Sequence, residues 1–201
     1  YWAVPAGAKS AKTGAWREGP GLEFLQAMHR AAPELRLIAE DLGMLDDGVR
    51  HLLAASGLPG MKVLQFAFST EEESSYLPHN FVPRCVGYIG TQDNDTTQGW
   101  MASGPADQVE HARRYLGIRG DKEAHWDFIR GLYMTPAELV VVQLQDVLGL
   151  PGDARMNKPG IAEGNWGWRL LPEQVAAETA KELRQMTELY ARCEAKKAGK
   201  Q

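Results

Sequence analysis

The chain has 201 residues, of which 44% are hydrophobic and 24% charged. This is typical of a globular domain and excludes a disordered, collagen-like or coiled-coil chain. A formal net charge of −4, from 22 basic and 26 acidic residues, provides no basic surface for nucleic acid. No apolar run is longer than four residues, the length of residues 139–142, which is too short to cross a membrane. Two cysteines without a Cys-x-x-Cys spacing indicate neither a disulfide framework nor a zinc site, so we expect a reduced, cytoplasmic compartment.

The first third of the chain predicts two helices and two strands. After a Gly-Pro-Gly break, residues 22–32 have the apolar spacing of a helix. The short apolar run at residues 36–40 predicts a strand, and acidic residues then precede a helix over residues 46–56. A Gly-Leu-Pro-Gly break ends that helix, and residues 61–68 follow as a second strand.

The middle of the chain continues this alternation. A polar, acidic loop over residues 69–75 leads to a third strand at residues 85–90. Helical periodicity predicts helices over residues 106–116 and 122–133. Residues 139–144 form the fourth predicted strand, and their β-branched run predicts a strand buried on both faces.

The last part of the chain predicts a loop and a helix. Residues 150–168 are rich in Gly, Pro and Asn and are expected to form an ordered loop. A long amphipathic helix is expected over about residues 172–197, with Pro172 in its first turn and a basic end at Lys196 and Lys197.

Strands that alternate with helices predict an α/β fold with a parallel sheet. Four such strands fit either a small open sheet or half of an eight-stranded (β/α) barrel, and the pattern alone leaves both open. Because one domain takes about 150 residues and no repeat or low-complexity segment interrupts the sequence, we expect residues 1–201 to belong to a single domain.

Polar side chains follow three of the four predicted strands. They are Glu40-Asp41, Asp93-Asn94-Asp95 and Gln145-Asp146. Because ligands bind at the carboxyl ends of parallel strands, carboxylates gathered there suit acid/base chemistry on a polar, uncharged substrate such as a sugar. Asp41, Asp46 and Asp47 are better explained as caps of a helix. Glu40 ends an apolar run and is not placed to cap a helix, so a functional role stays open for it.

The segment that begins at Asp93 also has two non-catalytic explanations. Its Asp-Asn-Asp start resembles a calcium loop, but it lacks the glycine at the sixth position and has Gly104 where a bidentate Glu is needed. A simple turn with a helix cap is the explanation that stays open. The histidines have no metal-ligand spacing and no phosphate-binding glycine motif is present, so we predict neither a metal nor a cofactor.

Large apolar side chains in unusual places have two interpretations. Trp100, Trp166 and Trp168 fall in or beside polar loops, where their rings could stack on sugars or seal the loops against the core. The methionines are expected to fill the core, among them Met44, Met61, Met101 and Met134.

Seven collinear segments are together similar to one enzyme family. They are Ile38-Ala-Glu-Asp-Leu-Gly43, Gly57-Leu-Pro-Gly-Met-Lys-Val-Leu-Gln-Phe-Ala-Phe68, Leu77-Pro-His-Asn80, Gly90-Thr-Gln-Asp-Asn-Asp-Thr96, Leu144-Gln-Asp-Val-Leu-Gly149, Arg155-Met-Asn-x-Pro-Gly160 and Gly164-Asn-Trp-x-Trp-Arg169. Over essentially its whole length the sequence resembles the 4-α-glucanotransferases, also called amylomaltases or disproportionating enzymes.

The resemblance implies an elaborated (β/α)8 barrel, of which this chain forms the carboxyl-terminal half, and a retaining double displacement on α-1,4-glucans. Glu40 resembles the family's general acid/base, and Asp93 resembles the carboxylate that holds the hydroxyls of the distorted sugar. The implied substrate-binding residues are Gln92, Asn94, Asn157, Asn165 and Trp166, of which the last three either contact sugar or fix loops. The implied partners are maltooligosaccharides and α-1,4-glucans, without a cofactor, nucleic acid or membrane.

Two departures from the family pattern matter. The family's nucleophile is an Asp in an Arg-Ile-Asp-His-like motif shortly before the segment that matches Tyr1. We therefore expect a carboxyl-terminal fragment that is inactive alone and leaves strand edges open. Gln92 stands where the family usually has His, and Gln cannot carry a proton or a charge. A non-catalytic α-glucan-binding protein is therefore the alternative.

Overall fold

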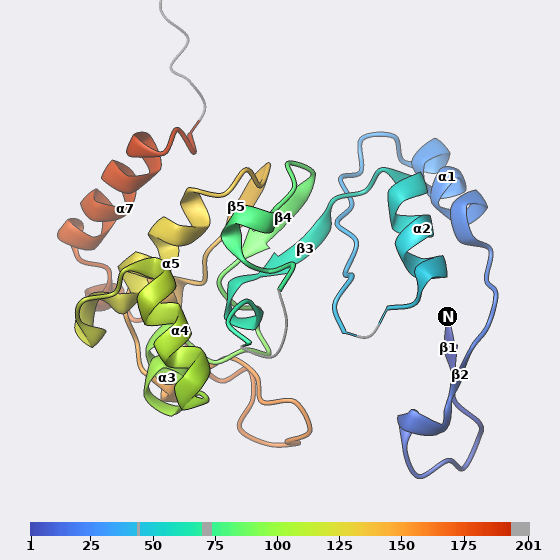
Figure 1. Ribbon diagram of the computed structural model, residues 1–201, viewed down its shortest axis with the longest axis horizontal. Helices are drawn as coiled ribbons and strands as arrows, with labels where there is room; N and C mark the ends of the chain where they lie inside the picture. The colour runs from blue at the N-terminus through green and yellow to red at the C-terminus, as the bar shows by residue number, and fades with distance from the viewer. Residues whose placement is uncertain (44, 70–73, 194–201) are drawn as a thin grey trace, which may run out of the picture. The chain divides into compact units, whose positions relative to one another are not determined.

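Figure 1 shows the computed structural model of the chain, which describes residues 1–43, 45–69 and 74–193. These residues belong to two compact units, residues 1–60 and the residues from 61 onward. Some predicted features lie outside the described residues: Met44, residues 70–73 of the acidic loop, and residues 194–197 of the last helix with its basic end. Within the described residues, no helix is long and apolar enough to cross a membrane.

Residues 1–60 contain a short hairpin and two helices. Strands β1 (Trp2–Ala3) and β2 (Ala15–Trp16) pair antiparallel, a feature that the sequence pattern does not reveal. Helices α1 (Gly21–Ala31) and α2 (Asp47–Ser56) confirm the two predicted helices. The Asp46 carboxylate caps α2 by accepting a hydrogen bond from the Val49 N–H at 2.9 Å.

The strand predicted at residues 36–40 is wrong, because these residues are irregular. The Ala39 N–H donates to the Pro59 carbonyl at 2.9 Å. Pro59 has no N–H with which to continue a ladder of hydrogen bonds, so the contact does not extend into a paired strand.

A three-stranded sheet organises the second unit. Strands β3 (Gly60–Val63), β4 (Cys85–Tyr88) and β5 (Leu139–Val141) are neighbours in that order. β4 and β5 run parallel, with Val86 opposite Leu139 and Tyr88 opposite Val141. Mixed helices and strands confirm the predicted α/β class, although each of these strands is shorter than expected.

The ends of β3 and β5 explain their reduced length. After β3 the chain enters a 3-10 turn, Leu64–Phe66, in which the Gln65 N–H donates to the Ile89 carbonyl at 3.0 Å. After β5 it enters the short helix α6 (Leu144–Val147). Burial of β5 on both faces is wrong: β5 is an outer strand of this sheet, and Leu139 and Val141 are 49% and 41% exposed.

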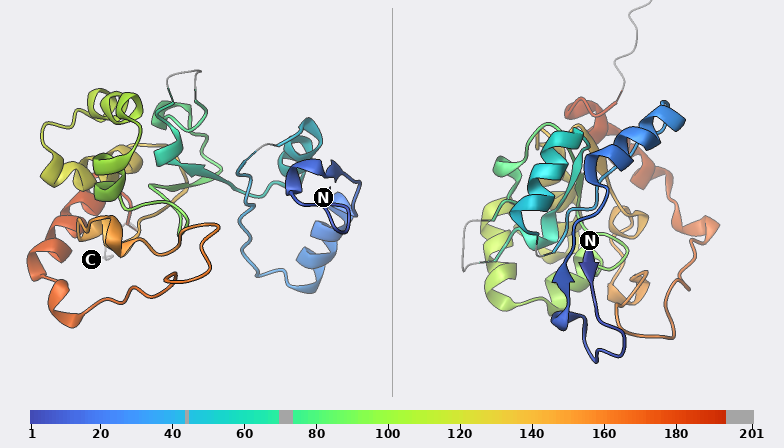
Figure 2. Two further views of the ribbon diagram at one scale, coloured as in Figure 1. Left: turned by 90° about the horizontal axis from the view of Figure 1, so that it is seen from below. Right: turned by 90° about the vertical axis from the view of Figure 1, so that its right-hand side faces the viewer.

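The longer helices of this unit lie on one side of the sheet in Figure 1. They are α3 (Thr97–Ser103), α4 (Ala106–Leu116), α5 (Ala124–Tyr133) and α7 (Ala177–Leu189). α4 and α5 confirm two predicted helices, whereas α3 has no counterpart in the prediction. The last helix is shorter than predicted, because Pro172 opens a separate 3-10 turn and α7 ends at Leu189. In Figure 2 (left), the segment between α6 and α7, in orange, forms a long open loop.

The core lies between the sheet and these helices. Phe68 packs its ring against Trp100 and Phe128, with both pairs of ring centroids 5.9 Å apart. Gly87 in β4 lets α5 approach closely, since a Cβ there would lie 2.8 Å from Leu132 Cδ1. Trp100 therefore packs against the core, in line with the second of its two interpretations.

The methionines follow the prediction only in part. Met101 is buried and Met61 is half-buried, whereas Met134 is exposed, so the expectation for Met134 is wrong. Met134 directly follows the last residue of α5, where the chain leaves the core.

Candidate active site

The loop between β4 and α3 is locked by its own residues. The Asn94 N–H donates to the Thr91 carbonyl at 3.1 Å. In return, Asn94 Oδ1 accepts hydrogen bonds from the Thr91 N–H at 2.9 Å and from the Thr91 hydroxyl at 3.0 Å. The Asn94 carbonyl oxygen is thus committed to the turn. Gln92 and Asp93, between these residues, are exposed.

A second loop holds Asp93 from outside. Asn157 Nδ2 donates to Asp93 Oδ1 at 2.6 Å, and the Asn157 N–H donates to the Gln92 carbonyl at 3.0 Å. The Arg155 guanidinium donates to the Asp93 carbonyl through Nη2 and to the Asn157 carbonyl through Nε, the latter at 2.9 Å. The structure therefore brings together the predicted residues Gln92, Asp93, Asn94 and Asn157. Asn157 fixes the Asp93 carboxylate, which is exposed to solvent.

The loop that follows is also cross-linked. The Asn165 side chain accepts from the Lys158 N–H at 2.8 Å and donates to the carbonyls of Lys158 and Ile161 at 3.2 and 2.8 Å. Of the two roles open to Asn165, this geometry favours loop fixing.

Trp166 has a backbone conformation that is unusual for a tryptophan. Its φ is 60°, and its N–H donates to the Met156 carbonyl at 2.7 Å. A bulky residue in this left-handed region is strained, and such strain concentrates at functional sites. The Trp166 side chain is 55% exposed.

Several residues that hold the Asp93 loop have no sequence-based prediction. Gln65 Nε2 donates to the Asp95 carbonyl at 2.8 Å, and Gln143 Nε2 donates to the Gly90 carbonyl at 3.2 Å. Arg155 acts on carbonyl oxygens in the same way. These residues lie in or next to the seven segments that resemble the family, and the sequence contains no other signal for them. A side chain that bonds to the backbone has no characteristic spacing.

The titratable groups beside this loop do not form a metal site. Within the described ranges, no three His, Cys, Asp or Glu side chains are grouped so that they could hold a metal ion. His125 accepts or donates across 3.3 Å to Gln98, and burial lowers the pKa of its imidazole. Burial also raises the pKa of Asp146 to about 6, with a further contribution from the charge of Asp95.

Glu40 has very different surroundings. It lies in the unit of residues 1–60, and its side chain is exposed. Within the described part of the chain it makes no hydrogen bond or ion pair. Its neighbour Asp41 packs under Gly60, where a Cβ would lie 3.0 Å from Asp41 Oδ1. The local contacts therefore place Asp41 but do not fix Glu40.

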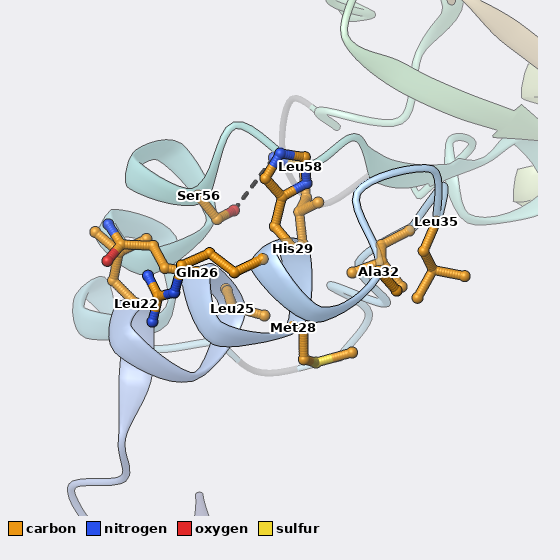
Figure 3. A pocket seen from close by; sticks show the side chains of 11 residues that line it. Leu22, Leu25, Gln26, Met28, His29, Ala32, Leu35, Ser56 and Leu58 are labelled. Atoms are coloured by element: carbon orange, nitrogen blue, oxygen red, sulfur yellow. Dashed lines mark hydrogen bonds between the residues drawn. The ribbon is translucent and has the colours of Figure 1, made fainter.

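A pocket of about 290 Å³ lies in the same unit (Figure 3). Leu22, Leu25 and Met28 of α1 line it together with Leu58, whose N–H donates to the Ser56 hydroxyl at 3.2 Å. Its lining is mostly apolar and does not include Glu40. The pocket therefore contains none of the predicted site residues.

The sequence profile of one protein family, described as 4-alpha-glucanotransferase, matches residues 1–174. The chain belongs to this family. The match confirms the resemblance predicted from the seven collinear segments.

Individual relatives agree with the family match. The chain is 43% identical over 194 residues to a 4-alpha-glucanotransferase of Synechocystis, and 41% identical over 199 residues to one of Thermus thermophilus. Each alignment covers 96% of this chain, but 38% and 40% of the relative. A chloroplastic or amyloplastic 4-alpha-glucanotransferase of Arabidopsis thaliana is 38% identical, with 34% of its length covered. The chain thus spans about two-fifths of these relatives or less, and the compartment stays a prediction.

A solved structure has the same fold over the same region. It is an amylomaltase from Streptococcus agalactiae in complex with acarbose, with a TM-score of 0.87 and 32% identity. The superposition covers 95% of this chain and 39% of the amylomaltase. The fold of the chain is therefore that of the corresponding part of an amylomaltase.

Proposed function

We propose that the protein containing this chain is a 4-α-glucanotransferase. It transfers α-1,4-glucan segments to the 4-hydroxyl of an acceptor glucan or of glucose, by a retaining double displacement. The observation that carries the proposal is the Asp93 carboxylate, which Asn157 holds at 2.6 Å on an exposed loop in a member of this family. Maltooligosaccharides are the proposed substrates, in line with the acarbose complex of the related amylomaltase.

The two carboxylates have separate proposed roles. Glu40 protonates the leaving glycosidic oxygen and then takes the proton of the acceptor hydroxyl. Asp93 accepts hydrogen bonds from sugar hydroxyls through the oxygen that Asn157 does not use, and so favours the distorted, oxocarbenium-like transition state. The nucleophile is a carboxylate supplied from sequence preceding Tyr1, so the 201 residues alone should not release glucose from maltotriose.

The remaining predicted residues complete a sugar-binding surface in this proposal. Gln92 and the Asn94 amide donate to hydroxyls, and the Trp166 ring stacks on a sugar face. Asn157 orients Asp93, and Asn165 shapes the loop that carries Trp166. β3, β4 and β5 are neighbouring strands of one (β/α)8 catalytic barrel to which residues 1–201 contribute the carboxyl-terminal half.

Substitution of each carboxylate in the complete natural protein tests the proposal. Glu40→Gln and Asp93→Asn keep the shape of each side chain and remove its charge and proton chemistry. We expect each to lower kcat for release of glucose from maltotriose by about 1,000-fold. Glu34→Gln, which changes another exposed Glu of the same unit, is the matched control and should retain full turnover. Near-normal turnover in Glu40→Gln would remove Glu40 from the mechanism.

A non-catalytic glucan-binding protein is the second candidate, and Gln92 favours it. A glutamine donates a hydrogen bond but cannot share a proton with a developing charge. Calorimetry with a maltodextrin, beside a turnover assay on the same complete protein, separates the candidates. Binding with turnover supports the transferase, and binding without turnover supports the second candidate alone.

A further inference from the structure

A buried carboxylate outside the proposed catalytic set lies beside the Asp93 loop. Asp146 in α6 is 1% exposed, and its Oδ1 accepts a hydrogen bond from the Thr97 N–H at 2.7 Å. Among the described residues, neither its Oδ2 nor the buried Thr97 hydroxyl has a hydrogen bond of good geometry, although the Thr97 hydroxyl lies close enough to lower the pKa of the carboxyl. A buried polar atom without a partner costs free energy, so the presence of this carboxylate calls for a reason other than stability.

The bond to Thr97 fixes the far end of the Asp93 loop. Thr97 is the first residue of α3, directly after that loop. The near end is fixed from the same segment of chain, because Gln143 donates to the Gly90 carbonyl at 3.2 Å. Residues 143–146 therefore hold the loop at both ends, and Asp93 lies between the two attachment points.

Asp95 transmits the position of α3 to the loop. Its Oδ1 accepts a hydrogen bond from the Thr96 N–H at 2.8 Å, next to the N–H that Asp146 binds. The Asp95 carboxylate fills a slot between Gly99 and Gly152, where a Cβ on Gly152 would lie 2.9 Å from Asp95 Oδ1. Asp95 is therefore packed tightly against α3 and the Gly152 backbone.

The charges around Asp146 disfavour its ionised form. Burial raises its pKa to about 6, the hydrogen bonds from the Thr97 N–H and hydroxyl oppose that rise, and the charge of Asp95 adds a smaller increase. From α5, His125 packs against Gly149, where a Cβ would lie 2.8 Å from its ring, and burial lowers the pKa of that imidazole. The burial of Asp146 thus works against its ionised form, so stability alone does not explain why an ionisable group stands there.

We propose that Asp146 is a positioning residue for Asp93. By binding the Thr97 N–H it sets where the loop between β4 and α3 ends, and so where the Asp93 carboxylate lies. This inference rests on the proposed function, since it requires that Asp93 acts on the sugar. It gives α6 a part in catalysis that acts through the Thr97 N–H.

Two substitutions at Asp146 in the complete natural protein test this role, with maltotriose as the substrate. Asp146→Ala removes the acceptor of the Thr97 N–H. We expect kcat to fall about 30-fold and KM to change by less than about threefold, because a misplaced catalytic group slows the chemical step. Asp146→Asn keeps an acceptor oxygen and should retain kcat within about threefold. Asp127→Asn, on α5 and paired with Arg130 at 2.6 Å, is the control and should leave kcat unchanged.

A double variant separates positioning from a general loss of structure. Because Asp146 acts through Asp93, Asp146→Ala should lower kcat by less than about threefold in an Asp93→Asn background. If the fold-reductions in kcat of the two single variants multiply in the double variant, the inference is overturned. It is also overturned if a folded Asp146→Asn loses as much kcat as Asp146→Ala. If Asp146→Ala does not fold, Asp146→Asn decides: retained kcat supports positioning by the acceptor oxygen, and a loss above about tenfold overturns it.

The same series separates failure of the inference from failure of the proposed function. Full turnover in Asp93→Asn would refute the proposed role of Asp93, and the positioning role of Asp146 with it. Unchanged kcat in Asp146→Ala beside an inactive Asp93→Asn would refute the positioning role alone.

Discussion

The two units of the molecule hold their predicted catalytic carboxylates in different ways. Asp93 follows a strand of a sheet with a buried core, and side chains from three separate segments bond to its loop: Gln65, Gln143, Arg155 and Asn157. Glu40 ends an irregular segment in residues 1–60, where no described apolar side chain is buried. One carboxylate is positioned by its own unit, and the other is not.

This difference separates two requirements of the proposed reaction. A residue that holds sugar hydroxyls in the transition state must stay where it is throughout, and the contacts of Asp93 provide that. A residue that first donates and then accepts a proton needs surroundings that favour its protonated form. Within the described part of residues 1–60, the Glu40 side chain is exposed and makes no hydrogen bond or ion pair.

The largest expected contrast between the units is in their response to the loss of an apolar side chain. Phe128→Ala should lower the free energy of unfolding by about 4 kcal/mol, because Phe128 is completely buried against Phe68 and Trp100. Leu25→Ala, at the open pocket between α1 and the segment after α2, should cost less than about 1 kcal/mol. Urea unfolding of the complete protein measures both values. Equal losses would show that residues 1–60 have a core as well packed as that of the second unit.

The second contrast depends on pH and concerns Asp146. Its pKa is raised from 3.8 to about 6, mainly by burial, so the folded protein favours the protonated acid. The stabilisation from that protonation is complete below about pH 4 and is lost as the pH rises through about 6. Asp146→Asn, which does not ionise, should therefore raise the free energy of unfolding by about 3 kcal/mol near pH 8 and by little near pH 4.

Urea unfolding at several pH values measures this gain. His125 is present in both proteins, so its own titration cancels in the difference between them. A gain that stays constant from about pH 4 to about pH 8 would contradict the buried, titrating carboxylate.

The sequence predicts best what local periodicity determines. The helices α1, α2, α4 and α5 are confirmed because caps and apolar spacing act within one helix. The strand at residues 36–40 is wrong because a strand depends on a partner, and there the neighbouring segment contains Pro59. β5 has the β-branched sequence of a buried strand, yet it is an outer strand of this sheet, since burial is a property of the neighbours.

The candidate site shows the same division. Resemblance to a family identified Asp93 and Asn157, and the structure brings them together. The bonds of Gln143 and Arg155 to carbonyl oxygens could not be predicted, because any residue offers a carbonyl and the sequence does not say which one is in reach. The proposed positioning role of Asp146 could not be predicted from the sequence for the same reason, since its hydrogen-bond partner is a backbone N–H.

A third prediction concerns the space around Asp95. Gly99→Ala should destabilise the second unit by about 2 kcal/mol and lower kcat about tenfold, because a new Cβ would collide with the Asp95 carboxylate and the Gly152 backbone. Ala is the better helix former, which offsets part of the loss in stability. Gly120→Ala, where the new Cβ has no neighbour within 4 Å, is the control. Unchanged kcat in a folded Gly99→Ala would show that the loop tolerates movement of Asp95.

The smallest expected effect lies in residues 1–60 and concerns the cap of α2. Asp46→Ala should destabilise α2 by about 1 kcal/mol, because it removes the acceptor of the Val49 N–H. Asp47→Ala, one position along, removes only a 4.0 Å contact with Arg50 from an exposed side chain and should cost less than about 0.5 kcal/mol. Amide hydrogen exchange of α2 in the complete protein measures both changes.

Since α2 has no buried residue of its own, its cap contributes a larger share of its stability than a cap does for a helix packed into a core. Faster exchange confined to α2 would show that this helix opens independently of the rest of the protein. No change would contradict the expected contribution of the Asp46 cap to the stability of α2.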